Sequence, residues 1–546
     1  MKIIREYKIY IFGTLIIFLA AAPIVWRTCF LTVPLRISLE TTYVTEPLTS
    51  DGKRVDYFLA LEKLLYPPEM KTKDNGFRMI VQSFGIPTTQ DRLGIPFGEI
   101  TMGDLIEFYD LGFDNLLIEK LESLRKQFYE KLDLDPDAEP THTIKSTVDF
   151  LNEEEQKVFF DGKFWTLDDF PALADWLEES TAGIDRFAEA VRKPLFSIPM
   201  VRIDDEAPFT SMTTGVRKQA KQFNGFACAT RDRARYRIGI GDIDGAIEDV
   251  LTLYHFGKHA SKISDPPLFV GIEKMAHEIA LGSNPKHPLT KEQLEYFLRE
   301  FERLPPLVTM QEIGDQTRLE RLGYYCKNFT EPDTNLIGGL FGLGKWTSKA
   351  LDANVVMTNL NRFFDAVLDG RIVDVERECQ PSRNPFRYWT VRSRSVQASY
   401  YVGSDLLWLV NFLSSGIQNA EDADRLKRLT FALLLYEAEH GSLPEGDWRE
   451  AIKPYIGEVP DEYFRSPSGK SGYALLLYDT TMPSTPLLVE AESKNISPTG
   501  RMVDDIMSVT KERSNDGSGT WNYTYYYYNV SFRSGAVRMD SVKVDH

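Results

Sequence analysis

The stretch that decides the fold is RARYRIGIGDIDGAIEDVLTLYHFGKHASKISDPP, at Arg233–Pro267. Small and apolar residues recur on both sides of Gly241-Asp242 with the spacing of two helices joined by a tight turn. The second helix is predicted to open at Gly245-Ala246-Ile247. Each helix of such a hairpin has an apolar face to bury, so the stretch predicts a domain of packed antiparallel helices.

The hairpin resembles a single tetratricopeptide-type unit, a helical repeat of about 34 residues. No second copy follows at that period, and one hairpin cannot form a solenoid, so we expect a larger α domain instead. Helical spacing extends outward from the hairpin, from about Ser38 to Asn419. Clear examples are the stretches Asp56–Leu65, Met102–Leu132 and Leu173–Leu195. The sequence therefore predicts an α-helical domain over residues 37–420.

Beyond residue 420 the helical spacing gives way to short runs that favour strands. One helix is predicted at Asp424–His440, and Gly441 and Pro444 after it are typical of a helix C-terminus. Runs rich in Tyr, Val and Leu then follow, at Tyr473–Asp479, Pro486–Glu492, Trp521–Phe532 and Ala536–Val544. The polar stretch 493–519 predicts a loop. Together these features predict a small α+β module with antiparallel strands over residues 421–546.

The N-terminus carries an uncharged run of 18 residues, IYIFGTLIIFLAAAPIVW, at Ile9–Trp26. As a helix it would be about 27 Å long, close to the ~30 Å hydrocarbon core of a bilayer. Ala20-Ala21-Ala22 is compatible with a cleaved signal peptide, but the apolar run continues beyond it and is longer than usual for one. We predict an uncleaved transmembrane anchor, rather than a signal peptide or a buried core helix. Its residues are Ile9, Phe12, Leu15, Ile16, Ile17, Phe18, Leu19, Ile24, Val25 and Trp26.

Charge sets the expected orientation and the expected partners. Three basic residues precede the run and two follow it, at Lys2, Arg5, Lys8, Arg27 and Arg36. This bias favours a cytoplasmic N-terminus, with most of the protein on the periplasmic side of the inner membrane. The formal net charge is −17; residues 1–36 contribute +4, so all later residues together contribute −21. So acidic a body repels phosphate backbones, which excludes nucleic acid and leaves the lipid bilayer and other envelope proteins as expected partners.

Few residues stand in a pattern that carries chemistry. His255 and His259 are four apart on a predicted helix, so both imidazoles would share a face, as a metal site requires. The sequence fixes no third ligand, and the alternative is a polar helix face beside Lys258 and Lys262. The four cysteines form neither a close pair nor CxxC. The sequence thus predicts no catalytic residue and no cofactor, and the two histidines are weak metal candidates.

Three other stretches resemble the motifs of known binding or catalytic sites, but only in part. Gly339–Lys345 has the spacing of a phosphate-binding loop, but Trp346 stands where Ser or Thr is needed. Asp133–Pro140 begins like a calcium loop, but Ala138 replaces the required glycine. Glu-Ala-Glu-His at 437–440 places acids beside a histidine. We interpret it as the polar end of a structural helix, because the apolar residues before it define a buried stripe.

Several quoted motifs occur in an order that resembles a known set of proteins. These are DFPALADWLEES at Asp169–Ser180, RKP at Arg192–Pro194 and GDIDGA at Gly241–Ala246. The order is similar to that of uncharacterised membrane-anchored proteins from planctomycetes, over roughly residues 40–420. The resemblance implies an N-terminal anchor and a helical ectodomain. It implies no activity, because none is established for that set.

A second resemblance extends from Arg425 to about Tyr473. The segment is similar to the periplasmic domain of type II secretion pseudopilins, in which a helix leads into a small sheet. The matching positions are Tyr436, Gly441, Pro444, Tyr455, Pro460, Pro467, Gly469 and Tyr473. Residues 1–12 lack the prepilin-peptidase motif of a pseudopilin. The resemblance therefore implies a borrowed globular module rather than a pilus subunit.

These observations predict a single-pass membrane protein of the cell envelope, with residues 1–36 as tail and anchor. They favour a non-enzymatic scaffold or protein-binding ectodomain, since no catalytic motif is complete. One alternative is an envelope hydrolase whose site is not visible in the sequence. Another is a component associated with a secretion system.

Overall fold

The computed structural model shows a mainly helical protein, as the sequence predicts. It describes residues 22, 33, 35–85, 126–160, 164–200, 224–262, 266–281, 289–330, 351–369, 390–444, 447–457, 459, 461–464, 471–476, 487–492, 509–513 and 521–525. The residues named above as the membrane anchor lie outside this set. Among the helices that are described, none combines the length and the apolar character needed to cross a membrane.

The protein divides into two compact units. Unit 1 comprises residues 1–68, 199–214 and 309–414, and unit 2 comprises residues 69–198, 215–308 and 415–546. Helix α18, Val391–His440, contributes residues to both units. The boundary predicted at residue 420 lies inside this helix, and the division into 1–36, 37–420 and 421–546 stays a prediction.

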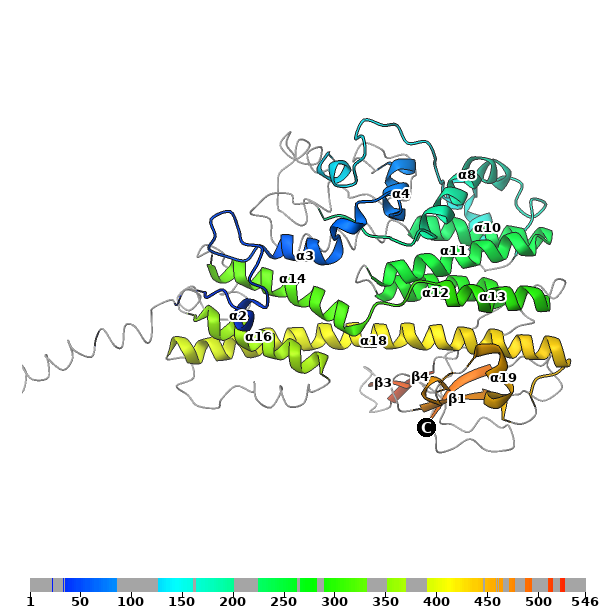
Figure 1. Cartoon of the computed structure of the whole chain (residues 1–546). Coiled ribbons are helices and arrows are strands. Elements are labelled where there is room, and N and C mark those ends of the chain that lie inside the picture. Colours follow the sequence, from blue (N-terminus) through cyan, green and yellow to red (C-terminus); the bar gives the residue numbers. More distant parts are fainter. Residues whose placement is uncertain are drawn as a thin grey trace, which may run out of the picture. The chain divides into compact units, whose positions relative to one another are not determined.

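Unit 1 is built from helices that pack in pairs. It contains α2 (Leu39–Thr42), α3 (Tyr57–Leu65), α14 (Met310–Thr330), α16 (Ala353–Leu368) and the first part of α18 (Figure 1). Helix α14 packs on α3 and α16, and α16 also packs on α2. The side chains of Ser38, Asp56 and Asp352 cap the starts of α2, α3 and α16 by accepting backbone N–H bonds. Arg318 of α14 pairs with Asp365 of α16 at 2.7 Å.

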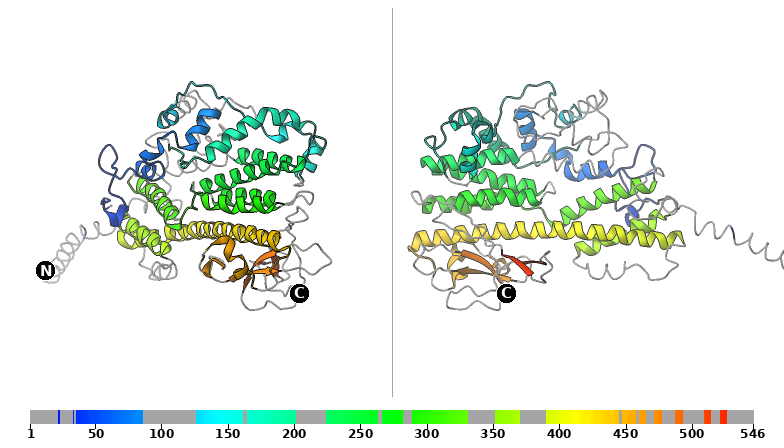
Figure 2. Two further views of the ribbon diagram at one scale, coloured as in Figure 1. Left: turned by 45° about the vertical axis from the view of Figure 1, so that its right-hand side comes forward. Right: turned by 180° about the vertical axis from the view of Figure 1, so that it is seen from behind.

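Unit 2 holds the helical hairpin and the helices around it. Its elements are α4 (Gly76–Phe84), η2 (Thr147–Phe150), α7 (Glu153–Phe160), α8 (Leu173–Val191), α10 (Asn224–Ile240), α11 (Ile243–Ser261), α12 (Pro266–Leu281), α13 (Lys291–Arg303), α19 (Trp448–Ile456) and η3 (Asp461–Phe464), with the short turn η1 (Pro68–Met70) at its edge. Helices α8, α10, α11 and α12 pack on one another, and α13 packs on α11. Figures 1 and 2 show α10 to α13 lying side by side.

The hairpin predicted at Arg233–Pro267 is confirmed. Helix α10 ends at Ile240 and α11 begins at Ile243. Gly241 between them has φ +84, a left-handed conformation that favours glycine. Asp242 caps α11 by accepting the backbone N–H of Gly245 at 3.1 Å. The predicted opening at Gly245 is therefore two residues late, because Gly245 is the partner of the cap and already helical.

An aromatic core joins the helices that carry the hairpin. Phe187 of α8 lies 5.3 Å from Phe226 of α10 and 5.2 Å from Phe256 of α11, between ring centroids. All three rings are fully buried. Trp165 and Trp176 form a neighbouring cluster at 6.3 Å. Burying a side chain of this size stabilises the fold by a few kcal/mol each, about 1.5–3 for phenylalanine. The core therefore holds α8, α10 and α11 in a fixed arrangement.

The C-terminal helix differs from its prediction at one end. The structure starts it at Val391, as α18, and not at Asp424. Its other end is confirmed, because α18 stops at His440. Gly441 follows with φ +77, and its N–H donates to the carbonyl of Glu437 at 2.8 Å. This is the glycine stop that the sequence predicts.

A small core follows the end of α18. The residues that form it come from α18, α19 and η3, namely Leu429, Ala432, Leu433, Trp448, Ile452 and Phe464. Further along the sequence are β1 (Ser471–Leu476), β2 (Leu487–Glu492), β3 (Val509–Arg513) and β4 (Trp521–Tyr525), with β1 antiparallel to β2 and β3 antiparallel to β4. Strand β3 lies inside the stretch 493–519, where the sequence predicts a loop. A single α+β module over 421–546 stays a prediction.

Replacing Gly183 by alanine is expected to destabilise unit 2 by about 1–3 kcal/mol, through overpacking. A Cβ at this position of α8 would lie 2.2 Å from the carbonyl oxygen of Thr143, which is backbone and cannot move aside easily. The matched control is Gly271→Ala in α12, where a Cβ would meet no atom within 4 Å. There the higher helix propensity of alanine should stabilise the helix by about 0.5–1 kcal/mol. Urea unfolding measures both, and equal signs for the two variants would contradict the packing argument.

Candidate functional site

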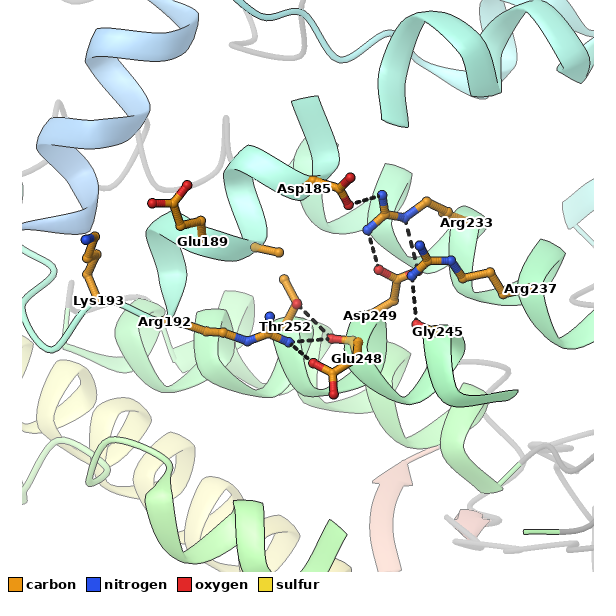
Figure 3. A pocket seen from close by; sticks show the side chains of 11 residues that line it. Asp185, Glu189, Arg192, Lys193, Arg233, Arg237, Gly245, Glu248, Asp249 and Thr252 are labelled. Carbon is orange, nitrogen blue, oxygen red and sulfur yellow. Dashed lines mark hydrogen bonds and ion pairs between the residues drawn. The ribbon is translucent and has the colours of Figure 1, made fainter. Parts of the chain in front are cut away.

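A pocket of about 580 Å³ opens on the surface of unit 2. Its walls are the last turns of α8 with the two residues after it, the C-terminal half of α10 and the first turns of α11 (Figure 3). Eight of the side chains that line it carry a formal charge, namely Asp185, Glu189, Arg192, Lys193, Arg233, Arg237, Glu248 and Asp249. The pocket is therefore a polar one, suited to a charged ligand group rather than an apolar one.

One wall of the pocket is an ion-paired group built around Asp249 of α11. Arg233 donates to both of its oxygens, with Nη2 2.5 Å from Oδ1 and Nε 3.1 Å from Oδ2. Arg237, one turn along α10, donates to Oδ2 at 3.0 Å, and Arg233 Nη1 donates to Asp185 of α8 at 2.6 Å. Asp249 is 1% exposed and Arg233 3%. Burial lowers the pKa of Arg233, but the two carboxylates outweigh it and raise that pKa. The buried pair of Arg233 and Asp249 joins α10 to α11, and the exposed Asp185 links Arg233 to α8.

A second group of contacts in the pocket is organised by Glu248, also on α11. Arg192 donates from Nη2 to Glu248 Oε2 at 2.6 Å and to its backbone carbonyl at 3.1 Å. The hydroxyl of Tyr296 on α13 donates to the other oxygen, Oε1, at 2.7 Å. Burial and this carboxylate raise the pKa of Tyr296 to about 12. Glu248 is thus held from two sides, and Figure 3 shows Arg192, just after the end of α8, paired with it.

The charges that line the pocket balance in number but not in pairing. Its four carboxylates all have cationic partners: three are those described above, and Glu189 pairs with Arg186 at 2.7 Å. Lys193 is half-buried in the pocket wall. Within the part of the protein that the structure describes, its ammonium has neither a hydrogen-bond nor an ion-pair partner. An ammonium can donate three hydrogen bonds, so this group is left to meet an anionic group of a ligand.

The predicted pair His255 and His259 lies on α11, outside the pocket. His259 is 1% exposed, and its Nε2 donates to the carbonyl oxygen of Val191 at 2.9 Å. Its ring stacks on Phe196 with centroids 4.8 Å apart. Burial lowers the pKa of His259 to about 3 and that of His255 to about 4. Among the described residues no group of three or more His, Cys, Asp or Glu is placed to hold a metal ion. The structure therefore assigns His259 a packing role.

A second charged group lies in the interior of unit 2, between α11, α12 and α18. Asp424 Oδ1 accepts from Lys258 at 2.7 Å and from Lys427 at 2.9 Å, and Lys427 also contacts Glu273 Oε2 at 3.3 Å. Burial would raise the pKa of Asp424, but the two ammonium groups outweigh it and hold that pKa below its usual range. Burial raises the pKa of Glu273 and lowers that of Lys258. The Lys427 side chain is 1% exposed, so we assign this group to stability.

The Glu-Ala-Glu-His end of α18 is occupied by packing contacts. Glu439 pairs with Lys291 at 2.7 Å and accepts from the hydroxyl of Tyr455 at 2.5 Å. His440 stacks on Tyr436 with centroids 4.0 Å apart, and its Nδ1 donates to the Tyr436 carbonyl at 2.9 Å. These contacts agree with the interpretation of the segment as a helix terminus. The phosphate-loop-like stretch 339–345 lies outside the described residues.

The pocket itself was missed by reasoning from the sequence. One signal was present, because Arg233 and Arg237 are four apart and must share a face of α10. Arg192 and Lys193 appeared only as part of a resemblance motif. What could not be seen is that Asp185, 48 residues before Arg233, comes to lie against it. Comparisons of the sequence and the fold with protein-family models, with curated proteins and with solved structures find no match.

Proposed function

We propose that this protein is a membrane-anchored scaffold of the cell envelope, with its bulk on the periplasmic side, that binds another protein through the pocket of unit 2. The observation that carries the proposal is Lys193, the cation in a pocket whose carboxylates are already paired. The partner group that fits is a carboxylate, from an acidic side chain or from the C-terminus of the partner. The N-terminal run at residues 9–26 supports the anchor.

The pocket walls support binding because they are already organised. Arg233 and Asp249 are locked by two hydrogen bonds, and Arg192 is held on Glu248. Side chains that are fixed before a partner arrives lose little conformational entropy on binding. A long-range repulsion of acidic partners by the net charge of −17 is screened within a Debye length of about 8 Å at physiological salt. Close contacts in the pocket therefore decide the interaction.

A photoreactive amino acid at position 189 should crosslink one discrete partner in intact membranes. Glu189 lines the pocket and its side chain is exposed. Lys193→Glu should lower the yield of this adduct about tenfold or more, because the carboxylate of the partner would then meet a like charge. The measurement is the amount of adduct, with the partner identified by mass spectrometry.

Two controls make this result specific. Glu178 is exposed on the same face of α8, about 16 Å away at 1.5 Å per residue, and outside the pocket. A photoreactive group there should give no such adduct, and Lys157→Glu on the surface of α7 should leave the adduct at position 189 intact. The proposal is wrong if position 178 gives the same adduct, or if Lys193→Glu leaves the yield unchanged.

We also propose that residues 421–546 form a pseudopilin-like α+β module associated with a secretion system. Support comes from the small core that the end of α18 makes with α19 and η3, where Tyr455 lies edge-on to Tyr436 at 6.3 Å. Both tyrosines are positions of the pseudopilin resemblance. Co-purification of the full-length protein with pseudopilins would support this role, and a complex that contains none would remove it.

A further inference from the structure

The turn after α8 brings Arg192 and Lys193 into the pocket, and Pro194 follows them directly. Helices usually stop before a proline, because its ring disfavours helical backbone in the residue that precedes it. Helix α8 accordingly ends at Val191, and the N–H of Lys193 donates to the carbonyl of Ala190 at 3.1 Å. The proline explains why the helix ends, but it does not fix where the turn lies. Contacts with other elements must do so.

On the C-terminal side of the turn, the side chain of Asn75 binds both backbone groups of one residue. Its Nδ2 donates to the carbonyl of Ser197 at 3.0 Å, and its Oδ1 accepts the N–H of Ser197 at 3.1 Å. Beside it, the N–H of Gly76 donates to the carbonyl of Leu195 at 2.7 Å. Asn75 is fully buried, and its side chain also caps α4. The start of α4 therefore holds residues 195–197 in one register.

On the N-terminal side of the turn, His259 of α11 binds the last residue of α8. Its Nε2 donates to the carbonyl of Val191 at 2.9 Å. Its ring stacks on Phe196, which lies beyond the turn, with centroids 4.8 Å apart. Helix α4 also contacts the end of α8, because a Cβ on Gly76 would lie 2.0 Å from the carbonyl oxygen of Ala190. Both α4 and α11 thus contact the chain before and after the turn.

We propose that Asn75 and His259 are positioning residues of the pocket, which hold Lys193 where the carboxylate of a partner can reach it. The inference rests on the proposed binding function, and it adds two residues that do not line the pocket. A long side chain on a fixed backbone loses less conformational entropy on binding than one on a mobile turn. If the two residues only stabilised unit 2, their loss would leave the pocket of the folded protein unchanged.

The first measurement is the reactivity of Lys193 toward an amine-acylating reagent in the purified full-length protein, followed by mass spectrometry. The exposed Lys157 of α7 is the internal reference. Asn75→Ser should keep the cap of α4, since serine is also a good N-cap, but the shorter side chain cannot bind both backbone groups of Ser197. The half-buried Lys193 should then react as readily as Lys157.

Two substitutions of His259 separate the hydrogen bond from the ring. His259→Phe keeps the stacking on Phe196 but loses the donor to Val191. His259→Gln loses the ring, but its amide nitrogen is the same number of bonds from Cβ as Nε2 and can donate to Val191. Because the donor is what fixes the end of α8, Lys193 should become reactive in His259→Phe and stay protected in His259→Gln.

The second measurement is the yield of the adduct at position 189. Asn75→Ser and His259→Phe should each lower it about fivefold, the factor that ordering one long side chain typically costs on binding. Thr147→Val is the matched control, because it removes another buried hydrogen bond of unit 2, to Asp232 at 2.9 Å, and lies outside the pocket. It should change neither the adduct yield nor the lysine reactivity.

The two measurements distinguish failure of this inference from failure of the proposed function. Absence of any adduct in the wild type would contradict the proposed function, whereas the reactivity of Lys193 would still report whether the turn is held. The inference is wrong if Lys193→Glu abolishes the adduct while Asn75→Ser and His259→Phe leave it unchanged, or if neither variant exposes Lys193. It is also wrong if Thr147→Val exposes Lys193 to the same extent, since general loss of stability would then explain all three variants.

Discussion

Replacing Lys427 by alanine is expected to lower the free energy of unfolding of unit 2 by about 3–5 kcal/mol. Its ammonium lies between Asp424 and Glu273, and over the ring of Tyr254 at 4.2 Å. Without it two carboxylates remain in the interior, with Lys258 as the cation that still pairs with Asp424. The buried carboxylate of Glu273 would be the less well compensated of the two, since its Oε1 already has no hydrogen-bond partner among the described residues. The measurement is amide hydrogen exchange in α11 and α12, which reports the free energy of opening.

Two comparisons test whether the charge, and not the volume, causes this loss. Lys427→Met/Glu273→Gln removes both charges of one pair and keeps their size, so it should be far closer to the wild type than Lys427→Ala. Lys291→Ala breaks the exposed pair with Glu439 and should have no measurable effect. Unchanged exchange in Lys427→Ala would contradict the account of this group as a stabilising network.

Local signals allowed the hairpin to be predicted from the sequence. The turn needs a residue in the left-handed conformation and a helix cap. Gly241 supplies the first and Asp242 the second, and the two are adjacent in the sequence. The length of α18 could not be predicted in this way. Its first part contains Gly403, which by propensity weakens a helix. In the structure a Cβ on Gly403 would lie 2.6 Å from the ring of Phe363 on α16. The glycine lets α18 pack closely on α16, and a local sequence pattern cannot predict such a tertiary contact.

The candidate sites show the same limit. Spacing correctly placed His255 and His259 on one helix, but the environment of His259 depends on Phe196 and Val191, which come from another part of unit 2. The pocket depends on contacts between the end of α8 and the hairpin, such as Asp185 with Arg233 and Arg192 with Glu248, which lie 48 and 56 residues apart in sequence. The sequence alone therefore does not show whether a charged side chain is buried in an ion pair or available to a ligand. Arg233 lies buried in an ion pair, whereas Lys193 is left without a partner among the described residues, and only the fold separates the two cases.

Unit 2 is expected to lose stability on acidification through His259, by on the order of 3 kcal/mol between pH 7 and pH 4. The pKa of His259 is lowered by burial from its usual 6.5 to about 3, with Lys262 and His255 also acting against its protonation. The unfolded state therefore takes up a proton at a higher pH than the folded one. The stabilising contribution is complete above pH 6.5 and is lost as the pH falls toward 3.

The geometry gives this loss a specific cause, which a variant can isolate. A carbonyl can only accept, so Nε2 carries the proton that binds Val191, and a second proton must go to Nδ1, a buried atom without a hydrogen-bond partner among the described residues. His259→Phe keeps the stacking on Phe196 and cannot titrate. It should be less stable than the wild type at pH 7, because the Val191 carbonyl loses its donor, by about 1–3 kcal/mol. Its stability should nevertheless fall less steeply toward pH 4.

His440→Phe, at the exposed end of α18, should retain the full wild-type pH dependence. If the pH profiles of His259→Phe and the wild type are parallel, the acid sensitivity resides in other groups, and the buried imidazole is only a packing element.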